Sequence, residues 1–136
     1  MAEFAFHHGG VSVPDLEAAI AWYGEVLGFA FEREFFIERE GAHAAFIRKG
    51  PLRFELFEVT GAAPLPEGRR SVSGDLKVHG NKHLGFRIAD LDVFLAEMRE
   101  KGVEIVLEVR KDFGSGCFIH DCFGNLIEFV EEPNDG

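Results

Sequence analysis

An internal repeat restricts this chain to a fold built from two copies of one structural unit. The segment HGGVSVPDLE, which begins at His8, aligns with HLGFRIADLD, which begins at His83, at an offset of 75 residues. The segment FELFE from Phe54 aligns with IEFVE from Ile127 at an offset of 73 residues. The first pair of segments shares a histidine and the second pair shares a glutamate. Two separate matches at nearly one offset indicate a true repeat with a small difference in loop length.

The first copy is predicted to form one strand, one helix and then three strands. Alternating apolar residues favour a strand over 4–13, and Asp15 is a good N-cap for a helix whose apolar residues follow at helical spacing. Gly28 is expected to end this helix. Turns at Gly41 and at Gly50 separate the remaining predicted strands. These three strands cover residues 29–38, 43–49 and 52–59.

The second copy repeats this order. Its helix is expected to begin after Asp90 and to end at Gly102. The predicted strands cover residues 83–88, 103–109, 113–120 and 125–131. We therefore predict an α+β fold in which two tandem βαβββ modules form a curved mixed-sheet cup. The predicted organisation is a single domain over 1–136, with modules at 4–59 and 83–131 and a linker or site-covering loop at 60–82.

Strand periodicity places one histidine and one glutamate of each copy on the sheet face that the helix does not cover. Side chains alternate between the two faces of a strand. His8 therefore lies opposite the apolar residues of its strand, and His83 does the same in the second copy. Glu55 and Glu128 are each flanked by apolar residues that point toward the helix. If the two copies curve into one cup, these four side chains converge.

Two imidazoles and two carboxylates are a suitable ligand set for one divalent metal ion. A carboxylate within an apolar strand is costly unless it has a partner, and a metal ion is one such partner. The set His8, Glu55, His83 and Glu128 suits Ni, Co, Mn, Fe or Zn and leaves room for water or substrate. The alternative is that the glutamates form salt bridges, for example with Arg53 or Arg87.

Three further side chains share strand parity with these ligands and are candidates for substrate binding. Arg53 and Arg87 either meet an anionic substrate or pair with acids at the rim of the cup. Phe57 is a candidate for the wall of the cup.

Charge and composition narrow the expected partners and compartment. The formal net charge is -10, from 24 acidic and 14 basic residues, which disfavours nucleic acids and anionic membrane surfaces as partners. No leader-like segment and no run of about 18 apolar residues is evident. Cys117 and Cys122 are expected to stay reduced. These observations favour a cytoplasmic protein that acts on a small molecule.

The motifs of both copies resemble those of the vicinal oxygen chelate superfamily, also called the glyoxalase/bleomycin resistance/extradiol dioxygenase group. HHGGVSVPDLEAAIAWYGEVLGF is similar to the opening strand and helix of that family, and KHLGFRIADLD and GNLIEFVE are similar to its second opening strand and last strand. The resemblance implies paired βαβββ modules around a metal ion, and a homodimer. It places the family's metal ligands on His8, Glu55, His83 and Glu128.

The four proposed ligands match the metal ligands of some enzyme subfamilies of this group better than those of others. A His/Glu/His/Glu set is similar to that of glyoxalase I, whereas methylmalonyl-CoA epimerases usually have Gln where Glu55 stands. Extradiol dioxygenases and thiol-transferring fosfomycin-resistance enzymes use two His and one Glu. The glutathione-contacting Arg of glyoxalase I is absent after His8, where Gly9 follows, and Cys122 replaces the usual Pro after Asp121.

The resemblance and the ligand set together predict an isomerase, epimerase or lyase that acts next to a carbonyl or carboxylate through a metal-stabilised enolate. Glu55 or Glu128 is expected to transfer the proton as general base and acid. One alternative is an Fe(II) extradiol-type dioxygenase. Another alternative is a non-catalytic resistance protein that binds a drug or natural product.

Overall fold

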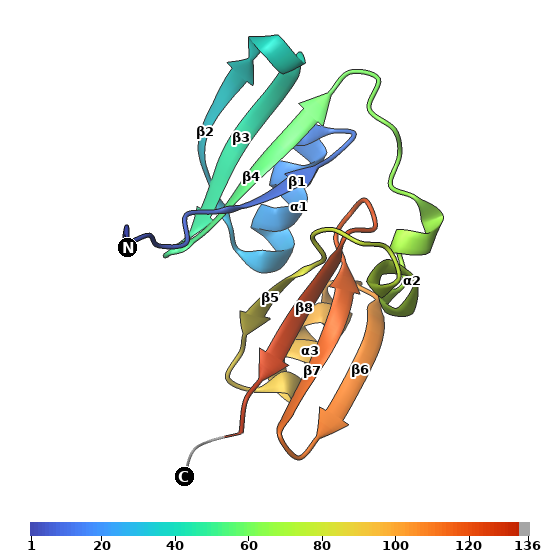
Figure 1. Cartoon of the computed structure of the whole chain (residues 1–136). Coiled ribbons are helices and arrows are strands. Elements are labelled where there is room, and N and C mark those ends of the chain that lie inside the picture. Colours follow the sequence, from blue (N-terminus) through green and yellow to red (C-terminus); the bar gives the residue numbers. More distant parts are fainter. Residues whose placement is uncertain (134–136) are drawn as a thin grey trace. The chain divides into compact units, whose positions relative to one another are not determined.

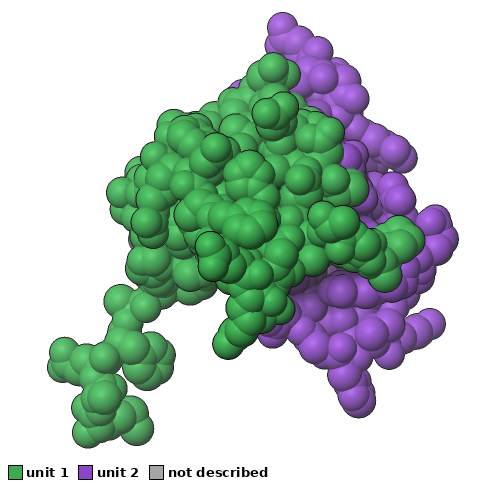
Figure 2. Space-filling view, turned by 90° about the horizontal axis from the view of Figure 1, so that it is seen from above, with its two compact units in different colours: residues 1–64 green, residues 65–136 purple. Residues whose placement is uncertain are grey.

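The protein is described here by a computed structural model in which residues 1–133 are placed. Contacts divide it into two compact units, of which the first covers Met1–Pro64 and the second begins at Leu65 (Figure 2). Each unit contains one strand, one long helix and three further strands in that order, so the predicted α+β fold of two βαβββ modules is confirmed. The arrangement of the whole chain as a single domain stays a prediction.

The first unit is a four-stranded mixed sheet covered on one face by a helix (Figure 1). The sheet order is β1-β4-β3-β2, with β1 parallel to β4 and the other pairs antiparallel. Its elements are β1 (Gly9–Ser12), α1 (Leu16–Leu27), β2 (Ala30–Ile37), β3 (Ala42–Lys49) and β4 (Leu52–Val59), with a short 3-10 helix at Glu38–Glu40.

The second unit repeats this topology with the sheet order β5-β8-β7-β6. Strand β5 is parallel to β8, and the remaining pairs are antiparallel (Figure 1). Its elements are β5 (Leu84–Arg87), α3 (Leu91–Glu100), β6 (Ile105–Lys111), β7 (Gly114–His120) and β8 (Leu126–Glu131). The two units therefore share one order of strands and one placement of the helix in the chain.

Both long helices begin at the aspartates that the sequence predicts. The carboxylate of Asp15 accepts a hydrogen bond from the backbone N–H of Ala18 at 3.0 Å, and Asp90 accepts one from Val93 at the same distance. Gly28 ends α1 with φ of 79°, a left-handed conformation that glycine adopts without steric cost. These caps satisfy backbone groups that a helix end would otherwise leave without partners.

Each helix buries its apolar stripe against one face of its own sheet. In the first unit, Tyr23 is fully buried, and its ring centroid lies 5.3 Å from that of Phe54 on β4. In the second unit, the ring of Phe94 lies 4.2 Å from that of Phe129 on β8. Because side chains alternate along a strand, the glutamates next to Phe54 and Phe129 point to the opposite, open face.

The predicted boundaries need correction at two places. The first strand is four residues long, not ten as residues 4–13 would make it, because β1 pairs only with Phe54–Phe57 of β4. Residues 60–82 are not wholly irregular, since they contain a 3-10 helix at Glu67–Arg69 and the short helix α2 at Val72–Leu76.

The connection between the modules is held by a buried acid. Asp75 of α2 is 4% exposed, and its Oδ1 accepts a hydrogen bond of 2.8 Å from Arg69. The Lys82 ammonium lies 3.4 Å from the same oxygen. The hydrogen bond from Arg69 and the charge of Lys82 outweigh burial and lower the pKa of the Asp75 carboxyl. None of the helices in the described part of the chain is long and apolar enough to cross a membrane.

Candidate metal centre

The open face of the first sheet brings His8 and Glu55 together. His8 lies directly before β1, where Gly10 pairs with Glu55 of the parallel strand β4. The Nε2 atom of His8 lies 3.1 Å from Oε1 of Glu55. The His8 side chain is 32% exposed and the Glu55 side chain is 16% exposed, so the pair is accessible yet partly shielded from water.

The second sheet contains the same pair. His83 lies directly before β5, where Gly85 pairs with Glu128 of the parallel strand β8. Its Nε2 atom lies 3.6 Å from Oε1 of Glu128, and the two side chains are 19% and 32% exposed. We call each His–Glu pair a half-site, the first formed by His8 and Glu55 and the second by His83 and Glu128.

A phenylalanine supports the histidine of each half-site. The ring of His8 meets Phe46 edge-on at 5.2 Å between centroids, and His83 meets Phe118 edge-on at 4.8 Å. Phe46 pairs across the sheet with Glu55, and Phe118 pairs with Glu128. Neither phenylalanine is among the residues that the sequence predicts for the site. A signal was available, because a Phe-Ile dipeptide occurs at the matched place in both third strands.

The two arginines do not bind the candidate ligands. Arg53 donates to Glu32 at 2.8 Å through Nη2 and to His7 at 2.7 Å through Nη1, and its side chain is only 17% exposed. Arg87 is 75% exposed and pairs with Glu132 at 3.3 Å. In the described part of the chain, Glu55 and Glu128 thus form no salt bridge with either arginine, which was the alternative to metal binding.

Phe57 lies on the open face beside the first half-site. Its Cε2 atom is 3.2 Å from the position that a Cβ atom on Gly10 would occupy. In the second unit the corresponding close neighbour of Gly85 is the carboxylate oxygen of Glu128, at 3.3 Å. Glycine at these two positions therefore leaves room for side chains of the parallel partner strand on the open face.

The spacing within each half-site suits two ligands of one ion. Nitrogen and oxygen ligands lie about 2.0–2.2 Å from Zn²⁺, so adjacent ligands of one ion lie about 3.0–3.5 Å apart. The observed N–O distances of 3.1 Å and 3.6 Å are close to that range. Over residues 1–133, however, no group of three or more His, Cys, Asp or Glu gathers at one place to hold a metal. Each unit by itself provides two candidate ligands.

Cys117 adds no ligand to the second half-site. It lies on β7 opposite Phe129, on the face that packs against α3, and it is fully buried. Burial raises the pKa of the Cys117 thiol to about 11, with a smaller contribution from the nearby charges of Glu108 and Glu128. The thiol therefore stays protonated at neutral pH, whereas metals bind the thiolate. Neither Cys117 nor Cys122 forms a disulfide in the described part of the chain.

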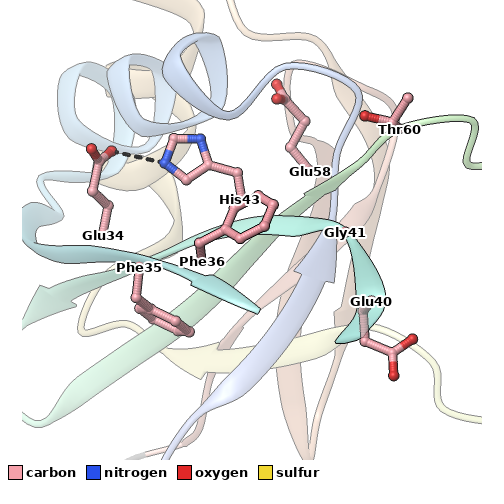
Figure 3. A pocket seen from close by; sticks show the side chains of 8 residues that line it. All are labelled: Glu34, Phe35, Phe36, Glu40, Gly41, His43, Glu58 and Thr60. Atoms are coloured by element: carbon pink, nitrogen blue, oxygen red, sulfur yellow. Dashed lines mark ion pairs between the residues drawn. The ribbon is translucent and has the colours of Figure 1, made fainter. Parts of the chain in front are cut away.

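A shallow pocket in the first unit (Figure 3) has neither His8 nor Glu55 among its lining residues. It is lined by Glu34, Phe35, Phe36, Glu40, Gly41, His43, Glu58 and Thr60. His43 and Glu34 form an ion pair at 3.3 Å, and Glu58 accepts a hydrogen bond from the backbone N–H of Leu16 at 2.9 Å. Because His43 and Glu34 pair with each other and Glu58 binds the first backbone N–H of α1, the pocket is a weaker candidate for a reactive site than the half-sites.

A comparison with protein families identifies the fold and its relatives. The model of the Glyoxalase/Bleomycin resistance protein/Dioxygenase superfamily matches residues 5–129. The chain belongs to this superfamily. The match includes both histidines and both glutamates of the half-sites, and the resemblance to the vicinal oxygen chelate group is therefore confirmed.

Relatives within the superfamily include enzymes. The mitochondrial methylmalonyl-CoA epimerase of Bos taurus is 29% identical over 133 residues, which cover 92% of this chain and 73% of the relative. The glyoxalase family protein from Enterococcus faecalis has a TM-score of 0.78 at 22% identity, covering 93% of this chain and 97% of that one. A mutant of the fosfomycin resistance protein FosX from Listeria monocytogenes, solved with Mn(II) and a phosphonic acid, has a TM-score of 0.67 at 17% identity over 94% and 92% of the chains. At such identities the solved structures establish the fold.

Proposed function

We propose that this chain is a metal-dependent enzyme that moves a proton on a carbon next to a carbonyl or carboxylate, as an epimerase or isomerase does. The observation that carries the proposal is the repeated half-site, because two equivalent carboxylates suit the removal and return of one proton. Similarity to methylmalonyl-CoA epimerase over 92% of the chain supports the epimerase class over a lyase.

The proposed metal ligands are His8, Glu55, His83 and Glu128, two from each module. Both half-sites, from one chain or from two chains of a homodimer, would share one divalent ion such as Ni, Co, Mn, Fe or Zn. When bound, this ion would supply positive charge that stabilises negative charge on the substrate's oxygen atoms.

The carboxylates of Glu55 and Glu128 would do the proton chemistry. Oε1 of Glu55 or of Glu128 would take the proton from the substrate carbon as a carboxylate, and the other residue, in its protonated carboxylic acid form, would return a proton to the same carbon. Phe46 and Phe118 contact the imidazoles edge-on and would help to hold their orientation. Arg53 and Phe57 of the first unit would bind an anionic part and an apolar part of a small-molecule substrate, respectively. Arg87 would meet the substrate only at the rim.

Proton transfer is tested with hydrogen exchange on a thioester substrate. The chelator-treated protein is reloaded with each candidate metal and incubated with methylmalonyl-CoA in D₂O, and deuterium at the acidic carbon is followed by NMR. We expect incorporation with at least one metal, and a decrease of about 10²–10⁴-fold in Glu55→Gln and Glu128→Gln, which is the usual effect of removing a general acid or base. Glu38→Gln, an exposed acid on the 3-10 helix after β2, serves as the control and should retain full activity.

Three results would contradict the proposal. Full exchange in both glutamine variants would show that these carboxylates do not move the proton. Oxygen consumption with Fe(II) and a catechol, without exchange on any thioester, would instead favour the dioxygenase. Tight binding of a drug-like ligand without any metal would favour the resistance protein.

A further inference from the structure

An unbroken chain of hydrogen bonds leads from Arg53 to Glu55 through two neighbouring histidines. Nη1 of Arg53 lies 2.7 Å from Nε2 of His7. Nδ1 of His7 lies 2.6 Å from Nδ1 of His8, and Nε2 of His8 lies 3.1 Å from Oε1 of Glu55. The two imidazole rings meet edge-on at 4.9 Å between centroids.

Only one placement of the ring hydrogens satisfies all three contacts. The guanidinium of Arg53 can only donate, so Nε2 of His7 must accept. His7 then carries its proton on Nδ1 and donates it to Nδ1 of His8. Since that nitrogen of His8 accepts, His8 carries its proton on Nε2 and donates it to Glu55. In this arrangement His8 is held in the Nε2–H tautomer.

This tautomer is the wrong one for the proposed metal ligand. A metal ion takes the lone pair of a nitrogen that carries no proton, and a ligating histidine usually donates its other ring N–H to a partner. The nitrogen of His8 that faces Glu55 is Nε2, which carries the proton. We propose that His7 is a positioning residue that fixes this proton on Nε2 and thereby lowers the affinity of the first half-site for a metal ion. The statement about affinity rests on the proposed function.

The second half-site has no equivalent of His7. The matched residue is Lys82, whose ammonium donates to the backbone carbonyls of Asp75, at 2.7 Å, and of Val78. Among the described residues, no hydrogen bond reaches Nδ1 of His83, so its tautomer is not fixed from that side. The two half-sites thus have the same histidine and glutamate and the same contact with a phenylalanine. They differ in the residue before the histidine, which is His7 in the first unit and Lys82 in the second.

Metal binding at His8 would change the hydrogen bonds as far as Arg53. When the proton of His8 moves from Nε2 to Nδ1, His7 must accept on Nδ1 and carry its own proton on Nε2. Each ring keeps one proton, so nothing is gained or lost. Nε2–H of His7 then faces an N–H of Arg53, and this contact breaks. Arg53 keeps its 2.8 Å bond to Glu32, and its Nη1 becomes available to an anionic group of the substrate.

Ring-nitrogen NMR tests the proton positions without any metal. In the chelator-treated parent protein, long-range ¹H–¹⁵N spectra should show His8 protonated on Nε2 alone and His7 protonated on Nδ1 alone. In His7→Asp a carboxylate oxygen replaces the Nδ1–H donor at nearly the same place, so Nδ1 of His8 should acquire a proton. A parent His8 with its proton on Nδ1, or an unchanged pattern in His7→Asp, would overturn the proposal.

The claim that His7 lowers metal affinity is tested by whether affinity rises or falls when His7 is replaced. His7→Phe removes the donor, adds no charge and keeps a ring next to Phe46. We expect Co²⁺ and Zn²⁺ to bind about tenfold more tightly to this variant, because binding no longer requires the hydrogen bond between Arg53 and His7 to break. His43→Phe, which lies in the pocket of Figure 3, is the matched control and should leave the affinity unchanged.

Weaker binding in His7→Phe would contradict the proposal, because it would show that His7 supports the metal ligand. Absence of metal uptake by the parent protein would refute the proposed function and the statement on affinity. The hydrogen-bond chain would still be decided by the NMR assignment, so the two failures can be told apart.

Discussion

Matched residues of the two modules make matched contacts. Each half-site pairs a histidine before the first strand with a glutamate on the parallel neighbour, and a phenylalanine on the next strand contacts the histidine edge-on. The histidine and the glutamate could be selected from the sequence because the repeat aligns them and strand alternation places them on one face. The phenylalanines could not be selected by alternation alone, because many of the 15 phenylalanines follow the same pattern.

Glycine at position 85 is predicted to keep the Glu128 carboxylate in place. A Cβ atom there would lie 3.3 Å from Oε1 of Glu128, so the carboxylate must move by a few tenths of an ångström in Gly85→Ala. We expect metal affinity, measured by competition with a chelating dye, to fall about tenfold, as for other changes around metal ligands. In Gly10→Ala the new methyl group meets the ring of Phe57 at 3.2 Å instead, so affinity should change less. Equal losses in both variants would contradict this account.

The residues that contact the first half-site from outside it, His7 and Arg53, could not be assigned their contacts from the sequence pattern. His7 was given no role from the sequence, because alternation places it on the other side of its strand from His8. It precedes β1, however, and its ring turns back to contact both His8 and Arg53. Arg53 has the expected parity, but its partners Glu32 and His7 come from segments whose proximity becomes clear only in the folded sheet.

At the level of the elements, caps and glycines predicted both long helices well, whereas strand ends depended on pairing. β4 begins at Leu52, and β1 joins it at Phe54, so little of the partner strand remains for residues before Gly9. The alternating pattern of residues 4–8 therefore does not produce a strand. A short helix such as α2 is equally hard to foresee, because it depends on the Ser71 cap and on buried Asp75 more than on a periodic pattern.

A glutamate from the last strand of each module holds the start of that module's helix. Glu58 accepts a hydrogen bond of 2.9 Å from the backbone N–H of Leu16, and Glu131 accepts one of 2.6 Å from Leu91. We expect Glu58→Ala to lower the free energy of unfolding in urea by about 1–2 kcal/mol, since it leaves this N–H without its charged acceptor. The exposed Glu38→Ala should change stability by less than about 0.5 kcal/mol. No loss in Glu58→Ala would mean that Asp15 alone secures the helix start.

The short helix α2 is predicted to weaken in acid through Asp75. Because the pKa of Asp75 is lowered in the folded protein, its stabilising effect is present above the usual pKa of about 3.8 and is lost as the pH falls through the folded value. Urea unfolding at a series of pH values below about 5 should therefore show a steeper loss of stability for the parent than for Asp75→Asn. Parallel curves for the two proteins would show that this carboxyl does not contribute.

At the level of the whole molecule, the repeat predicted two modules of one topology, and the structure and the family match agree with that prediction. The sequence could also place one His–Glu pair in each module. The sequence could not predict whether the two His–Glu pairs meet at one metal ion. That depends on contacts between modules or between chains, and the pattern within a module does not contain this information. The proposed homodimer belongs to the same question and can be examined by light scattering.

The central claim is that two half-sites share one metal ion, and metal stoichiometry tests it most directly. The purified protein is loaded, desalted and analysed by mass spectrometry beside His8→Ala, His83→Ala and Glu128→Ala. We predict about one Ni, Co, Mn, Fe or Zn ion per chain in the parent and loss of tight binding in every variant, whichever module it affects. Two ions per chain, with one retained in His8→Ala and in His83→Ala, would contradict a shared site. No metal in the parent, even after addition, would contradict the proposed function itself.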